Sequence, residues 1–221
     1  NQYKLFANIS SGYKTPTLFQ LYSNYGNKSL KPQNALNIEG GLQYFSSDNR
    51  IIGTVTLYKR KTTNVITFGQ NYKYINQDKQ LNSGVEIETS VMIDKSNSLK
   101  IFYAYTDGKV TTFENGKDTT YFNLIRQPKS VFSFTLNCKV TKQLFCSVGI
   151  THTGIRKDYY FDPNTFEKSM VNLKSYTLCN LYAEYSLAKN KIRLFAEGRN
   201  IFNTKFTEVY GYNTMGINAS V

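Results

Sequence analysis

Two acidic residues of this chain have a spacing that could support catalysis: Glu86 and Glu88, in the segment GVEIETSVMI. On an extended strand their side chains point to the same side, about 6.5–7 Å apart. A glycosidase can use two carboxyl groups at such a separation as its acid and base. A strand that turns a polar face toward water produces the same spacing, and we adopt this second interpretation. We predict no enzymatic activity and no cofactor.

Histidine and cysteine are too few to build most catalytic or metal sites. His152 is the only histidine, and the three cysteines include no CxxC pair, so neither a zinc site nor a histidine-based triad is indicated. Cys138 and Cys146 flank residue 142 symmetrically, which predicts that they lie opposite each other on neighbouring strands. An oxidising compartment would allow a disulfide between them. The alternative is two small side chains that face lipid, which is also our interpretation of Cys179.

The chain is strongly basic, with 27 Lys and Arg against 15 Asp and Glu and a net charge of +12. Such a charge raises the question of nucleic acid, but no binding motif accompanies it, so we predict no nucleic-acid partner. The local surplus lies in residues 13–33 and 59–80. Lysines near a membrane surface favour anionic lipids such as lipopolysaccharide. An anionic ligand, or charge that simply keeps loops solvated, would explain the surplus as well.

Strands must position all of these residues. In the segment 130–140, SVFSFTLNCKV, every second residue is apolar, which is the period of a strand with one apolar and one polar face. Similar alternation recurs along the chain, and no long helical period competes with it. We therefore predict an all-β protein with ten strands, near residues 2–11, 34–45, 50–60, 82–93, 98–107, 129–140, 144–155, 174–187, 191–200 and 216–221.

The connections between these strands alternate between short and long. Short ones are expected at residues 46–49, 94–97, 141–143 and 188–190, and long ones at 12–33, 61–81, 108–128, 156–173 and 201–215. Five long loops on one side are typical of an antiparallel transmembrane β-barrel, which has short periplasmic turns and long outer loops. Lipid also favours a closed sheet, because every backbone group must be paired within the protein.

One face of the predicted strands is charged, and we assign it to the lumen of the barrel. Charges directed inward suit a wide or plugged lumen better than a narrow one filled by side chains. The ten strands are therefore predicted to be a fragment of a larger barrel. The residues assigned to the lumen and to contact with a plug are Glu39, Glu86, Glu88, Glu184, Arg193, Glu197 and Arg199, and Lys139 shares their face.

Two motifs resemble the barrels of TonB-dependent outer-membrane receptors. The first is GYKTPTLFQLYSNYGNKSLKPQNALNIEGG, residues 12–41, in which Gln33 stands where the family usually has Glu. The second is EGRNIFNTKFTEVYGYNTMG, residues 197–216, with Ile201 and Phe206 in place of the usual Leu and Tyr. The ending TEVYGYNTMG most resembles the vitamin B12 (cobalamin) receptors, although iron-siderophore and haem receptors share much of it.

The resemblance implies a 22-stranded barrel with an N-terminal plug, of which residues 1–221 are the C-terminal portion of the barrel without the plug. It also implies TonB-energised uptake of a large, scarce ligand across the outer membrane of a Gram-negative bacterium. Cobalamin is the first expectation, and an iron-siderophore or haem the second. The implied partners are the plug, the TonB complex, outer-membrane lipid and a small-molecule ligand, and a surface lipoprotein is possible. The alternative is a passive porin-like or adhesin-type barrel.

Aromatic residues are concentrated in the five predicted outer loops. Aromatic side chains suit a large and partly flat ligand. They also suit the aromatic girdle of a barrel, or packing of loops on one another, and His152 would be at home near that outer rim. The candidate ligand-binding residues are Phe19, Tyr22, Tyr25, Tyr72, Tyr74, Tyr121, Tyr159, Tyr160, Phe161, Tyr210 and Tyr212, with Phe122 beside Tyr121.

Overall fold

The computed structural model describes residues 2–69, 72–114, 117–121, 125–165, 168–188 and 191–221. Phe122 lies outside these residues. The elements are β1 (Tyr3–Lys14), α1 (Leu18–Tyr22), β2 (Gln33–Phe45), β3 (Ile51–Phe68), β4 (Tyr74–Met92), β5 (Asn97–Glu114), β6 (Lys117–Tyr121), β7 (Ser130–Lys139), β8 (Leu144–Thr153), β9 (Arg156–Phe161), β10 (Lys168–Leu173), β11 (Tyr176–Leu187), β12 (Ile192–Arg199) and β13 (Asn218–Ser220).

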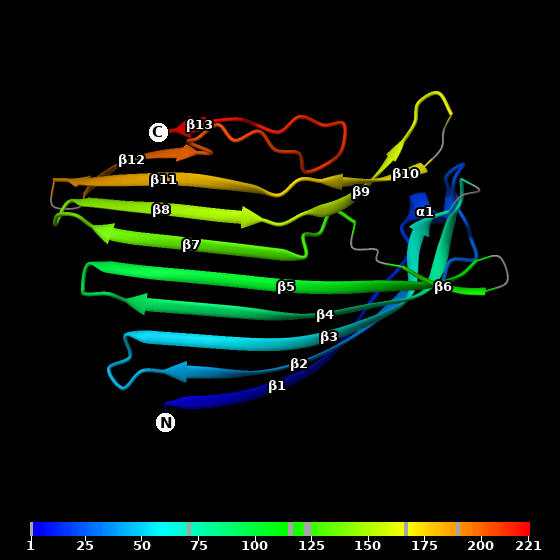
Figure 1. Cartoon of the computed structure of the whole chain (residues 1–221), viewed down its shortest axis with the longest axis horizontal. Helices are drawn as coiled ribbons and strands as arrows, with labels where there is room; N and C mark the ends of the chain where they lie inside the picture. The colour runs from blue at the N-terminus through cyan, green and yellow to red at the C-terminus, as the bar shows by residue number, and fades with distance from the viewer. Residues whose placement is uncertain (1, 70–71, 115–116, 122–124, 166–167, 189–190) are drawn as a thin grey trace.

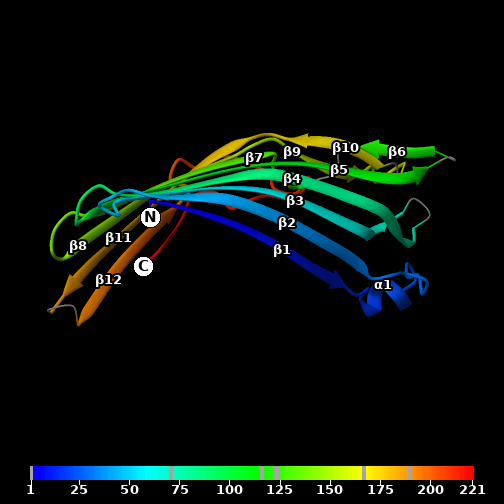
Figure 2. The same ribbon diagram turned by 90° about the horizontal axis from the view of Figure 1, so that it is seen from below.

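Ten strands form one antiparallel sheet in chain order, from β1 through β5, β7, β8, β11 and β12 to β13. They correspond one by one to the ten predicted strands, so the all-β antiparallel fold is confirmed. β6 pairs with β5 beyond the main sheet, and β9 and β10 form a separate hairpin. Seen from below, the sheet is curved (Figure 2). Among the described residues, no helix is long and apolar enough to cross a membrane.

The short turns lie at one end of the sheet, and α1, β6, β9 and β10 lie at the other (Figure 1). This arrangement matches the predicted alternation of connections. The short turns close on themselves through side chains. Asp94 Oδ1 accepts hydrogen bonds from the N–H groups of Ser96 and Asn97, at 2.6 and 2.9 Å. Such Asx turns are the reason that Asp, Asn and Ser recur in these connections. We call the two ends the turn end and the loop end.

Three of the predicted loops were wrong in extent. The segment 61–81 is largely strand, because β3 and β4 remain paired out to Phe68 and Tyr74. The segment 108–128 contains the end of β5 and all of β6, and 156–173 contains the β9–β10 hairpin. The sequence does not reveal this part of the strand, because a strand that has left the membrane is polar on both faces. The charged run Lys59-Arg60-Lys61 accordingly lacks the alternation of apolar and polar residues.

The strand register divides the sheet into a polar and an apolar face. Glu39 lies opposite Tyr58, and Glu86 and Glu88 lie opposite Thr56 and Thr54. Followed across the sheet, this register places all seven charged residues that we assigned to the lumen on one face. The other face exposes large apolar side chains, as the wall of a membrane barrel requires: Leu5, Ile9, Leu36, Ile38, Leu57, Ile87, Phe132 and Leu194.

A tyrosine on the polar face ties together three neighbouring strands. The ring of Tyr58 in β3 lies over Gly84 in β4, and its hydroxyl forms a 2.6 Å hydrogen bond with Oγ1 of Thr106 in β5. A Cβ atom at Gly84 would lie 2.5 Å from the Tyr58 hydroxyl. An aromatic ring that covers a strand glycine stabilises a curved sheet.

The two cysteines that we predicted to face each other do so. Cys138 in β7 is the register partner of Cys146 in β8, and both thiols are free in this structure, as is that of the buried Cys179. His152 in β8 lies on the apolar face, and its Nδ1 is 2.9 Å from Oγ1 of Thr177. Within the described part of the chain, no group of three His, Cys, Asp or Glu residues could hold a metal ion.

Candidate ligand-binding loops

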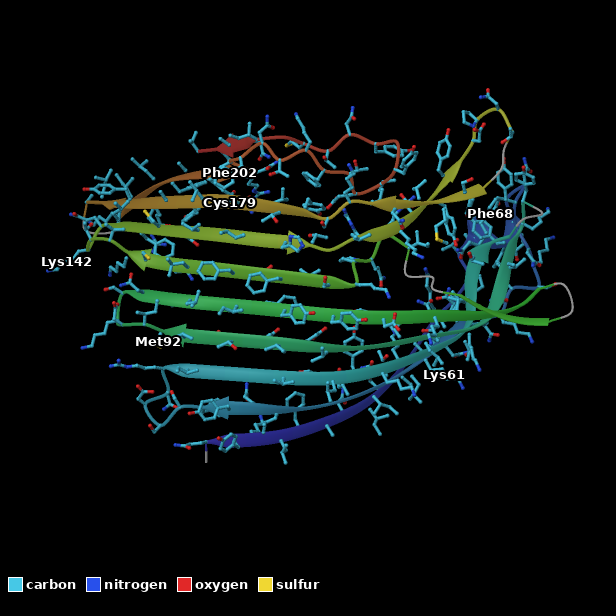
Figure 3. The ribbon with its side chains drawn as sticks, viewed as in Figure 1. Lys61, Phe68, Met92, Lys142, Cys179 and Phe202 are labelled. Atoms are coloured by element: carbon cyan, nitrogen blue, oxygen red, sulfur yellow. The ribbon has the colours of Figure 1, made fainter. Side chains whose placement is uncertain are left out.

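Five aromatic rings gather at the loop end and form what we call the first aromatic cluster: Phe19, Tyr25, Phe68, Tyr72 and Tyr74. Phe68, at the end of β3, is central, with ring centroids 5.8 Å from Tyr25, 6.5 Å from Tyr72 and 5.2 Å from Tyr74. Phe19 joins through Tyr74 at 6.3 Å. All four contacts are edge-to-face, which is a favoured geometry for aromatic pairs. Figure 3 marks Phe68 at this end.

The first outer loop is fixed to β4 by hydrogen bonds. Asn76 is the main anchor: its Oδ1 accepts from Lys31 N–H at 2.8 Å, and its Nδ2 donates to the carbonyl oxygens of Lys31 and Asn64 at 2.9 and 2.8 Å. Asn27 Nδ2 also donates to the carbonyl oxygen of Tyr74 at 3.0 Å. The aromatic rings of this loop are therefore held in place by backbone contacts as well as by their own packing.

We expect the substitution Asn76→Ala to release this loop locally. It removes three hydrogen bonds, each of which contributes on the order of 1 kcal/mol. Hydrogen exchange over residues 27–32 should become about 30-fold faster, corresponding to roughly 2 kcal/mol. Asn34→Ala is the control, because the side chain of Asn34 makes a long, 3.4 Å contact with the carbonyl oxygen of Pro32, its near neighbour in the chain. Equal exchange in the two variants would contradict the anchoring role.

The buried carboxylate of Asp158 in β9 joins three segments of the loop end. Its side chain is 0% exposed. Oδ1 accepts hydrogen bonds from Arg126 Nε and from Tyr159 N–H, and Oδ2 accepts one from Tyr210 N–H, each at 2.8 Å. The rings of Tyr160 and Tyr210 pack edge to face with centroids 5.0 Å apart. Asp158 thus links the β9–β10 hairpin to the connection after β6 and to the last outer loop.

Hydrogen bonds keep Asp158 ionised despite its burial. Burial alone raises the pKa of this carboxyl group, but the hydrogen bonds from Tyr210 N–H, Arg126 and Tyr159 N–H outweigh it, so the pKa lies below its usual range. A carboxylate that accepts several hydrogen bonds is stabilised in its charged form. The contact is therefore fully formed at neutral pH.

A second buried ion on β9 also holds the last outer loop. Arg156 in β9 donates from Nη2 to the carbonyl oxygens of Lys174 and Thr207, at 3.2 and 3.0 Å. Its guanidinium lies 4.7 Å from the ring centroid of Tyr176, which packs on Phe206 at 4.4 Å. Residues 206–210 are consequently docked on β9 through both Arg156 and Asp158.

The structure brings six of the eleven predicted aromatic residues together, in two separate groups at the loop end. Phe19, Tyr25, Tyr72 and Tyr74 belong to the first aromatic cluster. Tyr160 and Tyr210 pack on each other in the second group. Several of them lie in strands, not in loops as we predicted: Tyr74, Tyr121, Tyr159, Tyr160 and Phe161. Tyr22, in α1, packs under Lys28, whose Nζ is 5.4 Å from the ring centroid.

Sequence reasoning missed Phe68 and the two buried charges, Asp158 and Arg156. Phe68 belongs to a segment rich in β-branched residues, NVITF, that could have marked it as a strand residue. No local signal distinguishes Asp158 or Arg156 from other charged residues, because their partners lie far along the chain.

The polar face carries pairs of opposite charges. Arg199 donates from Nε and Nη2 to the two carboxylate oxygens of Glu197, at 2.8 and 3.0 Å. Arg193 Nε lies 3.8 Å from Oε1 of Glu184, whose Oε2 accepts a 3.0 Å hydrogen bond from the Tyr182 hydroxyl. Pairing along the wall is an ordinary role for charges that face a wet lumen.

Comparison with known proteins decides the family. A family model described as TonB dependent receptor-like, beta-barrel, matches residues 1–201. The chain belongs to the TonB-dependent receptor β-barrel family. The resemblance to TonB-dependent receptors is thus confirmed at family level, and the chain is part of the β-barrel of such a receptor. The narrower resemblance to vitamin B12 receptors stays a prediction.

Solved receptor structures share the fold. The ferripyoverdine receptor of the outer membrane of Pseudomonas aeruginosa is 16% identical, with a TM-score of 0.77, over 99% of this chain and 30% of that chain. The siderophore receptor PirA from Acinetobacter baumannii is 16% identical, with a TM-score of 0.75, over 99% and 38%. The FrpB iron transporter from Neisseria meningitidis is 13% identical, with a TM-score of 0.76, over 99% and 36%.

The chain therefore spans 30% to 38% of the length of these three TonB-dependent receptors. At such identities the similarity establishes the fold, while ligand and partners need their own evidence.

Proposed function

We propose that this chain supplies part of the barrel wall and several outer loops of a receptor that captures a ferric siderophore for TonB-energised uptake. Membership of the family supports uptake through TonB. The matched structures that are named as siderophore receptors support this ligand class. The observation that carries the proposal is a set of exposed aromatic rings on outer loops that are fixed to the strands β4 and β9 by hydrogen bonds.

A ligand could contact these aromatic rings directly, because they are exposed. Phe19 is 58% exposed, Tyr22 65% and Tyr72 55%, although the loops that hold them are fixed. Rigid aromatic rings contribute contact area with little loss of conformational entropy. A large ligand with aromatic or flat groups would stack on them.

Binding to the full-length receptor in detergent tests the proposal. The probes are a ferric catecholate, a ferric hydroxamate, haem and cyanocobalamin, each titrated by calorimetry. We expect one of the ferric siderophores to bind, and the double variant Tyr22→Ala/Tyr72→Ala to weaken that binding at least tenfold, as loss of interface anchors does. The control is Tyr3→Ala, because Tyr3 is also exposed but lies near the turn end. Absence of binding to every probe would refute the proposal.

Cobalamin is the second candidate, and one observation favours it. The segment TEVYGYNTMG, which resembles the cobalamin receptors, contains Tyr210 and the 72% exposed Tyr212. Cyanocobalamin binding that is lost in Tyr212→Ala, without siderophore binding, would select this candidate.

The partners follow from the same proposal. The polar face with Glu39, Glu86 and Glu88 would contact an N-terminal plug, and a TonB complex would act on that plug. A surface lipoprotein above the loops stays a prediction.

A further inference from the structure

Four lysines project from the apolar face of the sheet near the loop end. Lys59 and Lys61 in β3, Lys79 in β4 and Lys109 in β5 are all exposed. The register makes Lys61 and Lys109 the two neighbours of Leu81, and places Lys59 opposite Ser83. We call these residues the outer lysine patch. Figure 3 marks Lys61 in β3.

The patch lies at the height where the apolar wall ends. Below it, the same face of β3 carries Ile51, Val55 and Leu57, which are exposed. From Ile51 to Lys61 a strand advances about 33 Å, or roughly 25 Å across a membrane at the usual tilt. The outward apolar band of such a barrel is about 25 Å tall. Lys61 therefore lies where the headgroups of the outer leaflet begin.

The spacing of three of these lysines fits one phosphate group. Lys61 and Lys109 are two strands apart, about 10 Å between backbones, and Lys79 lies between their strands one pleat higher, about 8 Å from each. Lysine side chains are long and flexible enough to converge from these positions. Three ammonium groups could therefore reach the same anion.

Among the residues whose side chains the structure describes, no acidic group is paired with the patch. The ion pairs formed there do not include any of the four lysines. Asp107 is the nearest acid on the same face of β5, but its Oδ1 lies 3.3 Å from Nζ of Lys129. Its charge is therefore already balanced.

Apolar residues interleave with the lysines, and this favours a lipid over a free anion. Lys61 and Lys59 lie opposite Leu36 and Ile38 of β2, which are 44% and 48% exposed. The surface thus offers ammonium groups and aliphatic contacts side by side. A phosphorylated glycolipid of the outer leaflet presents the matching chemistry, a phosphate next to acyl chains.

We infer that the outer lysine patch binds the phosphate group of an outer-leaflet glycolipid. This inference depends on the placement of the barrel in the outer membrane and not on which ligand the loops bind. Its failure would leave siderophore binding, measured separately, unaffected.

Lipid binding by the full-length receptor tests the inference. The probe is bisphosphorylated lipid A, titrated into detergent-purified receptor and counted by native mass spectrometry. A lysine near an anionic membrane surface contributes about a fivefold factor in affinity. The variant Lys61→Gln/Lys79→Gln/Lys109→Gln should therefore bind on the order of 100-fold more weakly. The variant with Arg at all three positions should bind like the unsubstituted receptor.

The control variant removes the same charge from other surfaces. Arg60→Gln/Lys95→Gln/Lys142→Gln takes one cation from the polar face of β3 and two from the turn end, which Lys142 marks in Figure 3. It should retain affinity within about threefold, because Lys95 and Lys142 are far enough away to be screened and Arg60 projects from the opposite face of the sheet. Equal losses in the two triple variants would overturn the inference, since only net charge would then matter.

Two outcomes with the unsubstituted receptor would also overturn the inference. One is equal binding of lipid A from which both phosphates have been removed. The other is full displacement of lipid A by millimolar inorganic phosphate, which would make the patch a site for free anions.

Discussion

Replacing Asp158 with Asn should detach the last outer loop from the β9–β10 hairpin while the barrel stays folded. The substitution keeps the shape of the side chain but removes the charge that Arg126 faces, and turns an amide N–H group toward one of the donors. Loss of one partner of a buried ion pair usually destabilises by about 3–5 kcal/mol. We expect about 3 kcal/mol here, seen as roughly 100-fold faster exchange of the Tyr210 amide.

The matched control for this prediction is Asp162→Asn in the neighbouring turn. Asp162 is half-buried and accepts hydrogen bonds from the N–H groups of Asn164 and Thr165 within its own turn. Its substitution should leave the Tyr210 amide unchanged. Comparable acceleration in both variants would mean that general fraying, and not Asp158, controls the loop.

The same docking should depend on pH in one direction. Because the pKa of Asp158 is lowered in the folded state, the ionised carboxylate stabilises docking above the ordinary Asp value of about 3.9. That stabilisation is lost as the pH falls through the lowered folded pKa. Protection of the Tyr210 amide should therefore be constant between pH 7 and about 5 and decline only in stronger acid.

Replacing Gly84 with Ala should be among the most damaging single methyl additions in the sheet. The new Cβ would overlap the carbonyl oxygen of Tyr105 and the ring of Tyr58, so β4 must shift or the ring must leave. Overpacking usually destabilises by about 1–3 kcal/mol, and loss of the Tyr58–Thr106 hydrogen bond adds on the order of 1 kcal/mol. The midpoint of unfolding, followed by heat-modifiable gel migration, should fall clearly below that of the unsubstituted barrel.

Two further variants isolate the cause. Gly53→Ala should be nearly neutral, because the nearest atom to its new Cβ is Oγ1 of Thr89 at 4.0 Å. Adding Tyr58→Ala to Gly84→Ala removes the ring but leaves the clash with the Tyr105 carbonyl, so it should restore only part of the lost stability. An unchanged midpoint of unfolding in Gly84→Ala would contradict the prediction, since the Tyr58 ring would then not depend on the absence of a Cβ atom at residue 84.

The sequence was sufficient for the sheet but not for the contacts between loops. Period-two alternation identified ten strands and the face of the charged residues assigned to the lumen, because burial in lipid forces apolar residues to every second position. The extension of β3 past Lys61 was missed, because above the membrane that constraint no longer applies. The role of Asp158 was hidden for a different reason. Its partners Arg126 and Tyr210 are 32 and 52 residues away, and no short pattern joins them.

The extension of β3 and β4 beyond the outer lysine patch has a consequence for selectivity. From Lys61 to Phe68 the β3–β4 hairpin continues as paired strand for about 23 Å. The first aromatic cluster is therefore held above the lipid by a rigid two-stranded extension. A surface held in this way does not need to be ordered by what it binds, and binding loses little to entropy. It is also poorly able to reshape itself. Molecules whose outline fits should associate quickly, and near relatives with a different outline should be rejected rather than accommodated.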